Sequence, residues 1–306
     1  MAPWLTACRI AFAVSLPTQC ARHVLRPTCR PPPRRRVALR ACVTQQSIAP
    51  ALAVLRRAAD SQRLDVARLN SLVRLADLLL SESKRYNLTA IRTRDAVLLK
   101  HIVDALSLLP ALDAEAAAAP GALRVVDVGT GAGFPGLVLA IARPQWDVTL
   151  LEAARKKTRF HDIVERELAL RNVTSVWGRA EEVGQSKMHR GRYDAVVARS
   201  LAEMRVCCEL CVPLAKVGGV FFAQKSVGAG AEEIAAAKEA MRRLGGKLEG
   251  VHKAWLWEWM HGQGEEAEEI DRRKKCIVAV RKVKATPRAF PRLPGVPKKT
   301  PSRDRE

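Results

Sequence analysis

The sequence predicts an α/β protein with a doubly wound, Rossmann-like parallel sheet whose last strand is antiparallel, preceded by N-terminal helices. Three observations support this fold class. A β-branched run at residues 125–128 leads through three alternate glycines into an apolar helical run. Strand-like and helix-like segments then alternate up to residue 244. Two final strand-like segments, residues 247–255 and 276–283, have no helix of useful length between them, so we expect an antiparallel hairpin.

The elements between the glycines and residue 244 follow from the same reasoning. Short β-branched runs predict strands, and longer runs with apolar residues every three or four positions predict helices. The predicted strands are residues 125–128, 148–152, 173–177, 193–198 and 219–223, and the predicted helices are residues 137–142, 156–170, 202–214 and 229–244.

The glycine-rich turn is the centre of the predicted sheet. Gly129, Gly131 and Gly133 let the backbone bend sharply and let a ligand lie against it without a Cβ in the way. Open α/β sheets bind cofactors at such strand-to-helix turns. Residues 131–136 satisfy the glycine spacing of dinucleotide-binding turns. Asp127, two residues before the first glycine, is instead typical of enzymes that use S-adenosylmethionine (SAM). We expect SAM; a nicotinamide dinucleotide or a turn without a ligand are the alternatives.

Polar residues after the later strands complete the predicted cofactor site. Glu152 ends the second strand, where a carboxylate can accept hydrogen bonds from both ribose hydroxyls, although a helix cap is the alternative. The loop after the third strand places Glu181, or the backbone near Ala180, at the amino edge of adenine. Arg199 follows the fourth strand at the mouth of the site; its alternative role is an ion pair with an acid such as Asp194. Five alternating units and a terminal hairpin match the methyltransferase version of this fold.

The residues before the first strand are predicted to be mainly helical. Apolar residues recur at intervals of three and four from residue 48 to 109, with a loop at residues 84–91. Asp95 is expected to cap the helix that carries His101, a residue for which a hydrogen-bonded structural role is favoured over catalysis. The alanine-rich residues 111–121 read as a linker. The predicted organisation is a transit peptide at 1–44, a helical extension at 48–110, a SAM-dependent methyltransferase domain at 121–284 and a basic, proline-rich tail at 285–306.

The first 44 residues contain eight arginines and no acidic residue. An acid-free, arginine-rich leader is typical of organelle transit peptides. Residues 37–42 resemble a plastid processing site with cleavage near Ala41, so we expect the chloroplast, in the plastid stroma, with the mitochondrion as the alternative. A retained basic arm that binds nucleic acid is a third interpretation.

The rest of the chain is also basic. Since residues 1–44 carry eight of the positive charges, the net charge falls from +21 to +13 without them, and residues 281–306 contribute +7 through nine basic and two acidic residues. A basic protein suits a polyanionic partner, although an ordinary enzyme with a basic tail fits as well. No apolar run reaches transmembrane length, so no membrane partner is expected.

The cysteines do not predict a disulfide framework or a metal site. Four of the eight lie in the leader, at positions 8, 20, 29 and 42. Cys207 and Cys211 are one helical turn apart in an apolar stretch without a nearby histidine. We expect buried structural thiols there.

Four blocks of the chain resemble the bacterial-type 16S rRNA guanine-N7 methyltransferase family, RsmG or GidB. The glycine block is shared by many SAM-dependent enzymes, whereas the first and last blocks are far more specific. The resemblance runs from about residue 51 to 301 and omits the leader, much of a tryptophan-rich insert at 255–271 and the last few residues. At Phe290 the family often has tyrosine. The blocks are residues 86–91 (YNLTAI) with 101–104 (HIVD), residues 127–136, residues 178–182 (GRAEE) with 198–202 (ARSLA), and residues 286–299.

The resemblance implies transfer of a methyl group from SAM to N7 of a guanine in small-subunit (16S-type) ribosomal RNA. It implies cofactor contacts at Gly129, Phe134, Ala180, Glu181 and Arg199, to which the turn and the second strand add Gly131, Gly133 and Glu152. No catalytic acid, base or metal ligand is expected, because the N7 lone pair is free at neutral pH and alignment supplies most of the effect. Arg199 would also offer a donor to guanine O6 or to a phosphate.

The RNA side of the site is predicted from exposed cations. N7 lies in the major groove, which is deep and narrow in A-form RNA, so the target guanine has to be accessible. The prolines of the tail favour an extended strand, with a solvated tail as the alternative. We expect a monomer that acts on small-subunit ribosomal RNA or the assembling small ribosomal subunit. The candidate phosphate contacts are Lys225, Arg288, Arg292, Lys298 and Lys299.

Three other functions stay open at this point. The first is a methyltransferase for another RNA, a protein or a small molecule. The second is a nicotinamide-dependent oxidoreductase, favoured by residues 131–136 alone. The third is an RNA-binding ribosome assembly factor without catalytic activity.

Overall fold

A computed structural model of the protein describes residues 51–119, 121–254 and 275–301. All of them belong to one compact unit, Gln45–Glu306. The predicted transit peptide, the four cysteines of the leader and the insert at 255–271 lie outside the described residues.

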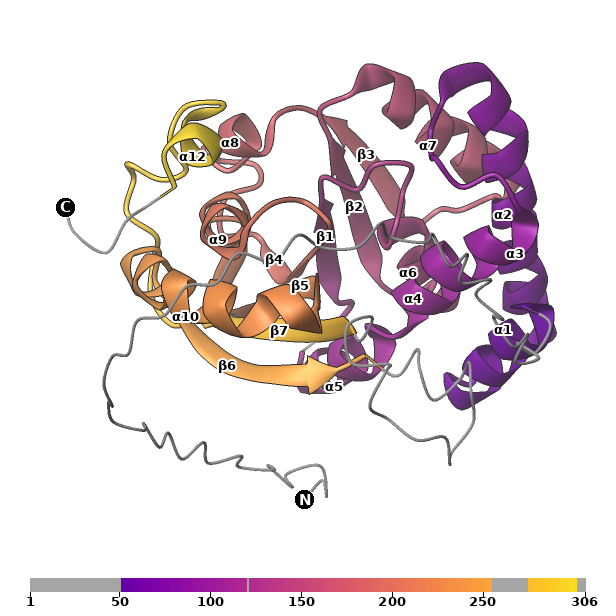
Figure 1. The fold of residues 1–306 in the computed structure, drawn as a ribbon, viewed down its shortest axis with the longest axis horizontal. Coiled ribbons are helices and arrows are strands. Elements are labelled where there is room, and N and C mark those ends of the chain that lie inside the picture. The colour runs from indigo at the N-terminus through magenta and orange to yellow at the C-terminus, as the bar shows by residue number, and fades with distance from the viewer. Residues whose placement is uncertain (1–50, 120, 255–274, 302–306) are drawn as a thin grey trace, which may run out of the picture. The chain divides into compact units, whose positions relative to one another are not determined.

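The described part of the chain is built around a seven-stranded sheet in the order β3-β2-β1-β4-β5-β7-β6 (Figure 1). β1 to β5 are parallel, and β7 is antiparallel to both of its neighbours, β5 and β6. The predicted fold class and the antiparallel terminal hairpin are therefore confirmed. The strands are β1 Arg124–Val128, β2 Asp147–Glu152, β3 Val173–Trp177, β4 Tyr193–Arg199, β5 Ala215–Ser226, β6 Gly246–Lys253 and β7 Lys275–Lys282.

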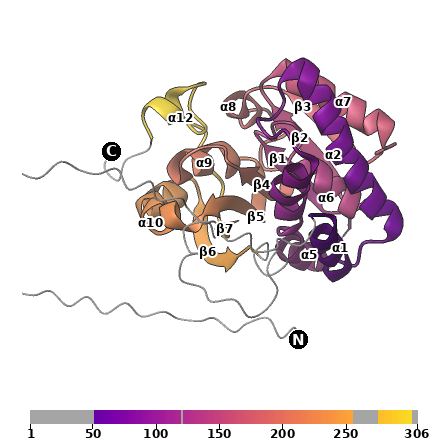
Figure 2. The same cartoon turned by 45° about the vertical axis from the view of Figure 1, so that its right-hand side comes forward.

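Helices cover both faces of this sheet (Figure 2). Successive side chains of a strand point to opposite faces. Val125 accordingly belongs to a core shared with α1, α2, α6 and α7, whereas Val126 belongs to a core shared with α9 and α10. The helices are α1 Ala51–Ser61, α2 Val66–Tyr86, α3 Arg94–Val97, the π-helical segment η1 Leu98–Val103, α4 Asp104–Leu106, α5 Leu109–Ala118, α6 Gly136–Ala142, α7 Arg155–Glu167, α8 Ala180–Val183, α9 Met204–Cys211, α10 Val227–Arg243 and α12 Val296–Lys299.

Two details of the N-terminal helices differ from the sequence-based expectation. The hydroxyl of Thr93, rather than the carboxylate of Asp95, caps α3 by accepting a hydrogen bond from the Ala96 amide. Asp95 lies inside the first turn of that helix. Residues 109–118 form α5 instead of a linker, because the alanine-rich run has high helix propensity and Leu109 and Leu112 bury its first turns.

The environments of the four described cysteines agree with the structural role expected for them. Cys207, Cys208, Cys211 and Cys276 are buried thiols, and burial raises the pKa of Cys207 to about 11. Within the described ranges, no group of three or more His, Cys, Asp or Glu side chains is placed to hold a metal ion. No helix among these residues is both long enough and apolar enough to span a membrane.

Candidate active site

The glycine-rich bend after β1, residues 129–133, is hydrogen-bonded to the end of β2. The amides of Gly129 and Thr130 donate to the Leu151 carbonyl at 2.8 and 3.1 Å. Gly129 and Gly131 have φ angles of 67° and 64°, which glycine adopts without a Cβ penalty. A Cβ added at Gly131 would meet no atom closer than the Lys157 Nζ, at 3.8 Å. One side of the bend is therefore open to a ligand that lies against the backbone.

Glu152 borders this open side. It is 8% exposed, its Oε2 accepts the Gly131 amide at 2.9 Å, and its Oε1 accepts the Ala154 amide at 2.8 Å. Ala154 immediately precedes α7, so the carboxylate also satisfies a donor at that helix start. Two carboxylate oxygens offer about four lone-pair positions, so acceptor capacity remains for hydroxyl groups of a ligand. The Lys157 Nζ lies 3.9 Å from Oε2 and partly balances its charge.

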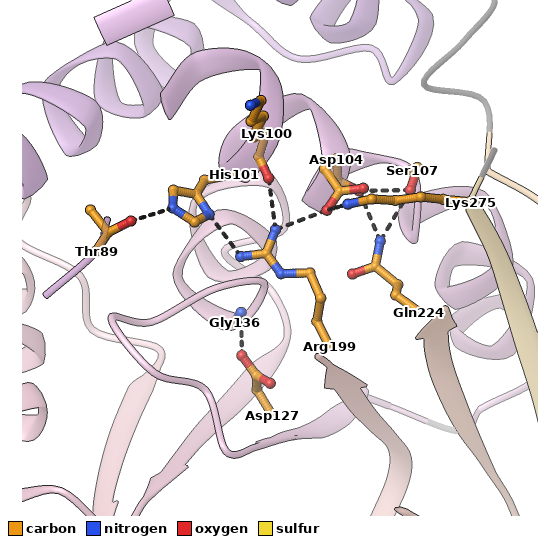
Figure 3. Close-up of polar contacts among 10 residues, drawn as sticks. All are labelled: Thr89, Lys100, His101, Asp104, Ser107, Asp127, Gly136, Arg199, Gln224 and Lys275. Atoms are coloured by element: carbon orange, nitrogen blue, oxygen red, sulfur yellow. Dashed lines mark hydrogen bonds and ion pairs between the residues drawn. The ribbon is translucent and has the colours of Figure 1, made fainter. Parts of the chain in front are cut away.

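Asp127, in β1, stabilises the shape of the bend through hydrogen bonds to one residue within it and one just after it. Its Oδ2 accepts a hydrogen bond from the Thr130 hydroxyl. The same oxygen accepts a hydrogen bond from the Gly136 amide, at the start of α6, at 2.7 Å (Figure 3). Its Oδ1 is buried and accepts no hydrogen bond within the described part of the chain. Burial raises the pKa of Asp127 to about 6. A cationic ligand nearby would favour the ionised carboxylate.

His161 was missed by the sequence reasoning, although it also supports the bend. Its Nε2 lies 2.9 Å from the Gly131 carbonyl and its Nδ1 lies 2.9 Å from the Ser175 hydroxyl. With a proton on Nε2, the ring donates to the carbonyl and accepts from the serine. Burial lowers the pKa of His161, which keeps this neutral form. No local motif marks the residue, because its partners lie 14 and 30 positions away in the chain.

Arg199 lies at the end of β4 and faces the bend from the other side. Its Nη1 donates to the Lys100 carbonyl at 3.1 Å and to the Asp104 Oδ2 at 2.9 Å, and its Nη2 donates to the His101 Nδ1 at 3.0 Å (Figure 3). The guanidinium carbon is 5.9 Å from the centroid of the Phe134 ring. Of the five N–H groups of the guanidinium, Nε–H and one hydrogen on Nη2 are not used by described residues. These two donors are available to a substrate.

The acidic partner of Arg199 is Asp104 rather than Asp194. Asp104 is fully buried, and Lys275 also contacts its Oδ2, at 2.6 Å. Asp194 instead accepts the Arg124 amide and pairs with Lys216. Asp104 lies 95 positions before Arg199 in the chain, so no local pattern predicts their ion pair. The one indication in the sequence is that Asp104 belongs to the family-like block at residues 101–104.

His101 links this cluster to the loop before α3. Because its Nδ1 accepts from Arg199, its proton is on Nε2 and is donated to the Thr89 hydroxyl at 3.1 Å. The imidazole stacks on Phe134 with ring centroids 4.8 Å apart. Burial and the positive charge of Arg199 lower the pKa of His101 to about 4, so the ring is neutral at physiological pH. This agrees with the expected hydrogen-bonded role.

The residues expected near adenine were predicted to lie in a loop, but beyond the end of β3 they form the start of the short helix α8. The Gly178 amide donates to the Glu152 carbonyl at 3.1 Å, which joins the chain just before α8 to the side of the bend that Glu152 borders. Ala180 and Glu181 form the first turn of α8. The Glu181 Oε1 accepts the Gly295 amide at 2.9 Å, so this carboxylate also contacts the C-terminal tail.

The structure divides the five predicted RNA contacts into two groups. The Lys225 Nζ pairs with Glu233 at 3.2 Å and donates to the Ala202 carbonyl, and Arg292 pairs with Glu209 at 2.7 Å. The other three, Arg288, Lys298 and Lys299, have exposed side chains. All five assignments remain predictions.

The fold and the site together define a class of protein. A sheet with this strand order, an acid and alternate glycines in the turn after β1, and an acid at the end of β2 belong to SAM-dependent methyltransferases. Within that class, residues 68–255 match the family model described as GidB, rRNA small subunit methyltransferase G. The chain belongs to this family, and it is a methyltransferase rather than an oxidoreductase.

Relatives with this description cover most of the chain. The Ribosomal RNA small subunit methyltransferase G of Symbiobacterium thermophilum is 44% identical over 230 residues, which are 74% of this chain and 86% of that protein. Its counterpart in Deinococcus radiodurans is 41% identical over 251 residues, 81% of this chain and 91% of that protein. The counterpart in Desulforamulus reducens is 36% identical over 249 residues, 81% of this chain and 96% of that protein.

Proposed function

We propose that the protein transfers a methyl group from SAM to N7 of a guanine in small-subunit (16S-type) ribosomal RNA. Its family is described by methylation of small-subunit ribosomal RNA. One observation carries the proposal for the site: the open glycine bend has Glu152 on one side and, on the other, Arg199 with two donors that no described residue uses.

The residues present fit SAM. The open side of Gly131 admits a ligand close to the backbone, and Glu152 retains acceptor capacity for the ribose hydroxyls. The buried Asp127 places negative charge behind the bend, which suits a cofactor that carries an ammonium and a sulfonium. When bound, SAM supplies a methyl group on a positively charged sulfur.

The described residues around the bend then have to orient the base rather than activate it. The N7 lone pair needs no deprotonation, so a general base is not required for transfer. A hydrogen bond from Arg199 Nε–H or Nη2–H to guanine O6 would leave N7 free and fix its direction. The neutral His101, the Lys100 carbonyl and the buried Asp104 hold the guanidinium in place. Correct alignment of reacting groups is worth ~7–11 kcal/mol.

Methyl transfer to isolated RNA tests the proposal. The protein without residues 1–44 is incubated with deproteinised small-subunit RNA and SAM labelled on the methyl group, and the labelled nucleotide is identified after digestion. We expect 7-methylguanosine at one position, and little of it with Arg199→Ala. Label in a different nucleotide, or in protein but not RNA, would refute the proposal. Cofactor binding without any transfer would favour an assembly factor.

Our proposal for the cellular setting is a monomer that acts in the plastid stroma, on free ribosomal RNA or on the assembling small subunit. The acid-free leader supports import, and the basic charge of the remaining chain supports an RNA partner. A fluorescent fusion to residues 1–44 is expected to enter plastids. Accumulation in mitochondria, or import of a fusion that lacks these residues, would contradict this location.

A further inference from the structure

The C-terminal segment, residues 286–300, runs beside α8 and α9 (Figure 1). α8 carries Ala180 and Glu181, the residues expected to contact adenine. From the sequence, the basic side chains of this segment were predicted to contact RNA phosphates. Its contacts show that one side of it is instead held against the cofactor-binding domain.

Arg190 binds the backbone of the segment at three points. Its guanidinium donates to the carbonyls of Thr286 at 2.9 Å, Pro287 at 3.0 Å and Phe290 at 2.6 Å. It also donates to the Gly184 carbonyl, at the C-terminal end of α8, at 2.8 Å. One side chain therefore joins the end of α8 to the start of the segment.

Gln185 and Gly184 add further contacts between the end of α8 and the C-terminal segment. The side-chain amide of Gln185 donates through Nε2 to the carbonyls of Arg288 at 3.0 Å and Pro291 at 2.9 Å. A Cβ added at Gly184 would lie 2.8 Å from the Pro291 Cγ. The segment and the end of α8 are thus in close van der Waals contact and share hydrogen bonds.

Arg292 anchors the middle of the segment to α9. Its backbone amide and Nε donate to Glu209 Oε1 at 3.0 and 2.9 Å, and its Nη2 donates to Oε2 at 2.7 Å. Glu209 is 1% exposed. A buried carboxylate is tolerated when a cation and hydrogen bonds compensate it, so this anchor is specific for the arginine.

The last contact reaches the cofactor site itself. The Gly295 amide donates to Glu181 Oε1 at 2.9 Å, and Glu181 is 9% exposed. This bond joins the N-terminal end of α8 to the segment, whereas Arg190 and Gln185 join the C-terminal end of α8 to it. A four-residue helix has little stability of its own, so its position depends on these contacts.

We propose that residues 286–300 form a positioning element for the cofactor, which holds Ala180 and Glu181 at the adenine edge. Arg292 is then a positioning residue for SAM rather than a phosphate ligand. The exposed side of the segment, with Arg288, Lys298 and Lys299, remains available to RNA. This inference rests on the proposed cofactor site.

Substitution of Arg292 in the full chain tests the proposal. Arg292→Ala releases the anchor on α9, and we expect the KM for SAM to rise ~10-fold while kcat at saturating SAM and the KM for RNA stay within ~2-fold of wild type. The Kd values of S-adenosylhomocysteine and 5′-methylthioadenosine should rise by the same factor, because both molecules contain the adenosine. A purely structural role would lower the active fraction, and hence kcat, at unchanged KM values.

Two further variants complete the design. Lys299→Ala removes one positive charge from the exposed side of the same segment, and it should leave the KM for SAM unchanged. Gln185→Ala removes two hydrogen bonds to the segment without leaving a buried charge, and it should raise the KM for SAM by ~3-fold even if Arg292→Ala does not fold.

The outcomes separate this inference from the proposed function. An unchanged KM for SAM in Gln185→Ala and in any folded Arg292→Ala protein, with normal transfer by wild type, overturns the positioning element alone. A rise in the KM for RNA alone in Arg292→Ala also overturns it and returns Arg292 to the RNA surface. A wild-type protein that does not bind SAM would instead overturn the proposed function.

Discussion

Replacing Gly131 with alanine separates cofactor binding from folding. Gly131 has a φ angle of 64°, and an added Cβ would meet no atom closer than the Lys157 Nζ at 3.8 Å. The substitution therefore creates no clash inside the protein. Its main cost to folding is the positive φ, which disfavours a residue with a Cβ by ~1–2 kcal/mol. For a chain of this size, that loss lowers Tm by ~2–8 °C.

The effect on the cofactor should be larger than the effect on folding. The new methyl group would occupy the open side of the bend, where a ligand approaches the backbone. We expect the Kd of SAM to rise at least ~10-fold, which corresponds to ~1.4 kcal/mol of binding free energy. Gly129→Val separates cofactor binding from folding less well. Even a Cβ at Gly129 would lie 2.5 Å from the Leu201 Cδ1, so the substitution would also disturb packing.

Gly218→Ala is the matched control for Gly131→Ala. Gly218 lies in β5 with a φ angle of 88°, and apart from its two chain neighbours no described residue has an atom within 4 Å of an added Cβ. It should therefore lower Tm by a similar amount and leave the Kd of SAM unchanged. Titration calorimetry and thermal unfolding of both variants give the two quantities. A wild-type Kd for Gly131→Ala, or an equal loss of affinity in Gly218→Ala, would refute the placement of the cofactor on the bend.

Three further predictions concern the charged groups around the bend. Arg199→Ala should slow single-turnover transfer by ~100-fold or more, because it removes the donor proposed to orient the base; near-normal transfer would exclude that role. Burial raises the pKa of Asp127 to about 6, so the carboxylate becomes protonated below that pH and loses its attraction for the cationic cofactor. The Kd of SAM should rise as the pH falls from neutral through about 6, and calorimetry of Asp127→Asn should show no such dependence. Glu152→Ala should weaken binding of SAM by ~10–150-fold through lost charge-assisted hydrogen bonds, and should weaken an analogue without ribose hydroxyls by a smaller factor.

The sign of the Asp127 effect on stability is opposite to its effect on binding. Its pKa in the folded protein is raised from 3.8 to about 6, so the folded state holds the proton more tightly than the unfolded chain does. The stabilisation from that proton is complete below pH about 4 and is lost as the pH rises through about 6. Comparison of Tm for wild type and Asp127→Asn across this range measures it.

The elements that the sequence predicted correctly are those with local signals. The alternation of β-branched and amphipathic runs marks β1 to β5 and the helices α6, α7, α9 and α10, whereas the short helix α8 lies where a loop was expected. The lack of a helical sequence pattern of useful length between the last two strand-like segments predicts the antiparallel pairing of β6 with β7. The bend at Gly129 and Gly131 is also local, because positive φ angles and nearby acids depend on adjacent residues. The cap of α3 was predicted wrongly: the expected cap was Asp95, whereas Thr93, two residues earlier, accepts the capping hydrogen bond.

Sequence alone thus determined the fold class and brought Glu152 next to the glycine-rich bend, since both depend on residues that are neighbours in the chain or at the ends of adjacent parallel strands. Tertiary structure decided the partners of charged side chains. Asp104 reaches Arg199 across 95 positions, and Arg292 reaches Glu209 across 83, in competition with many other acids and bases of similar chemistry. Burial chooses among them, because a charge removed from water requires a specific partner, and burial is set by how the helices and the C-terminal segment pack on the sheet.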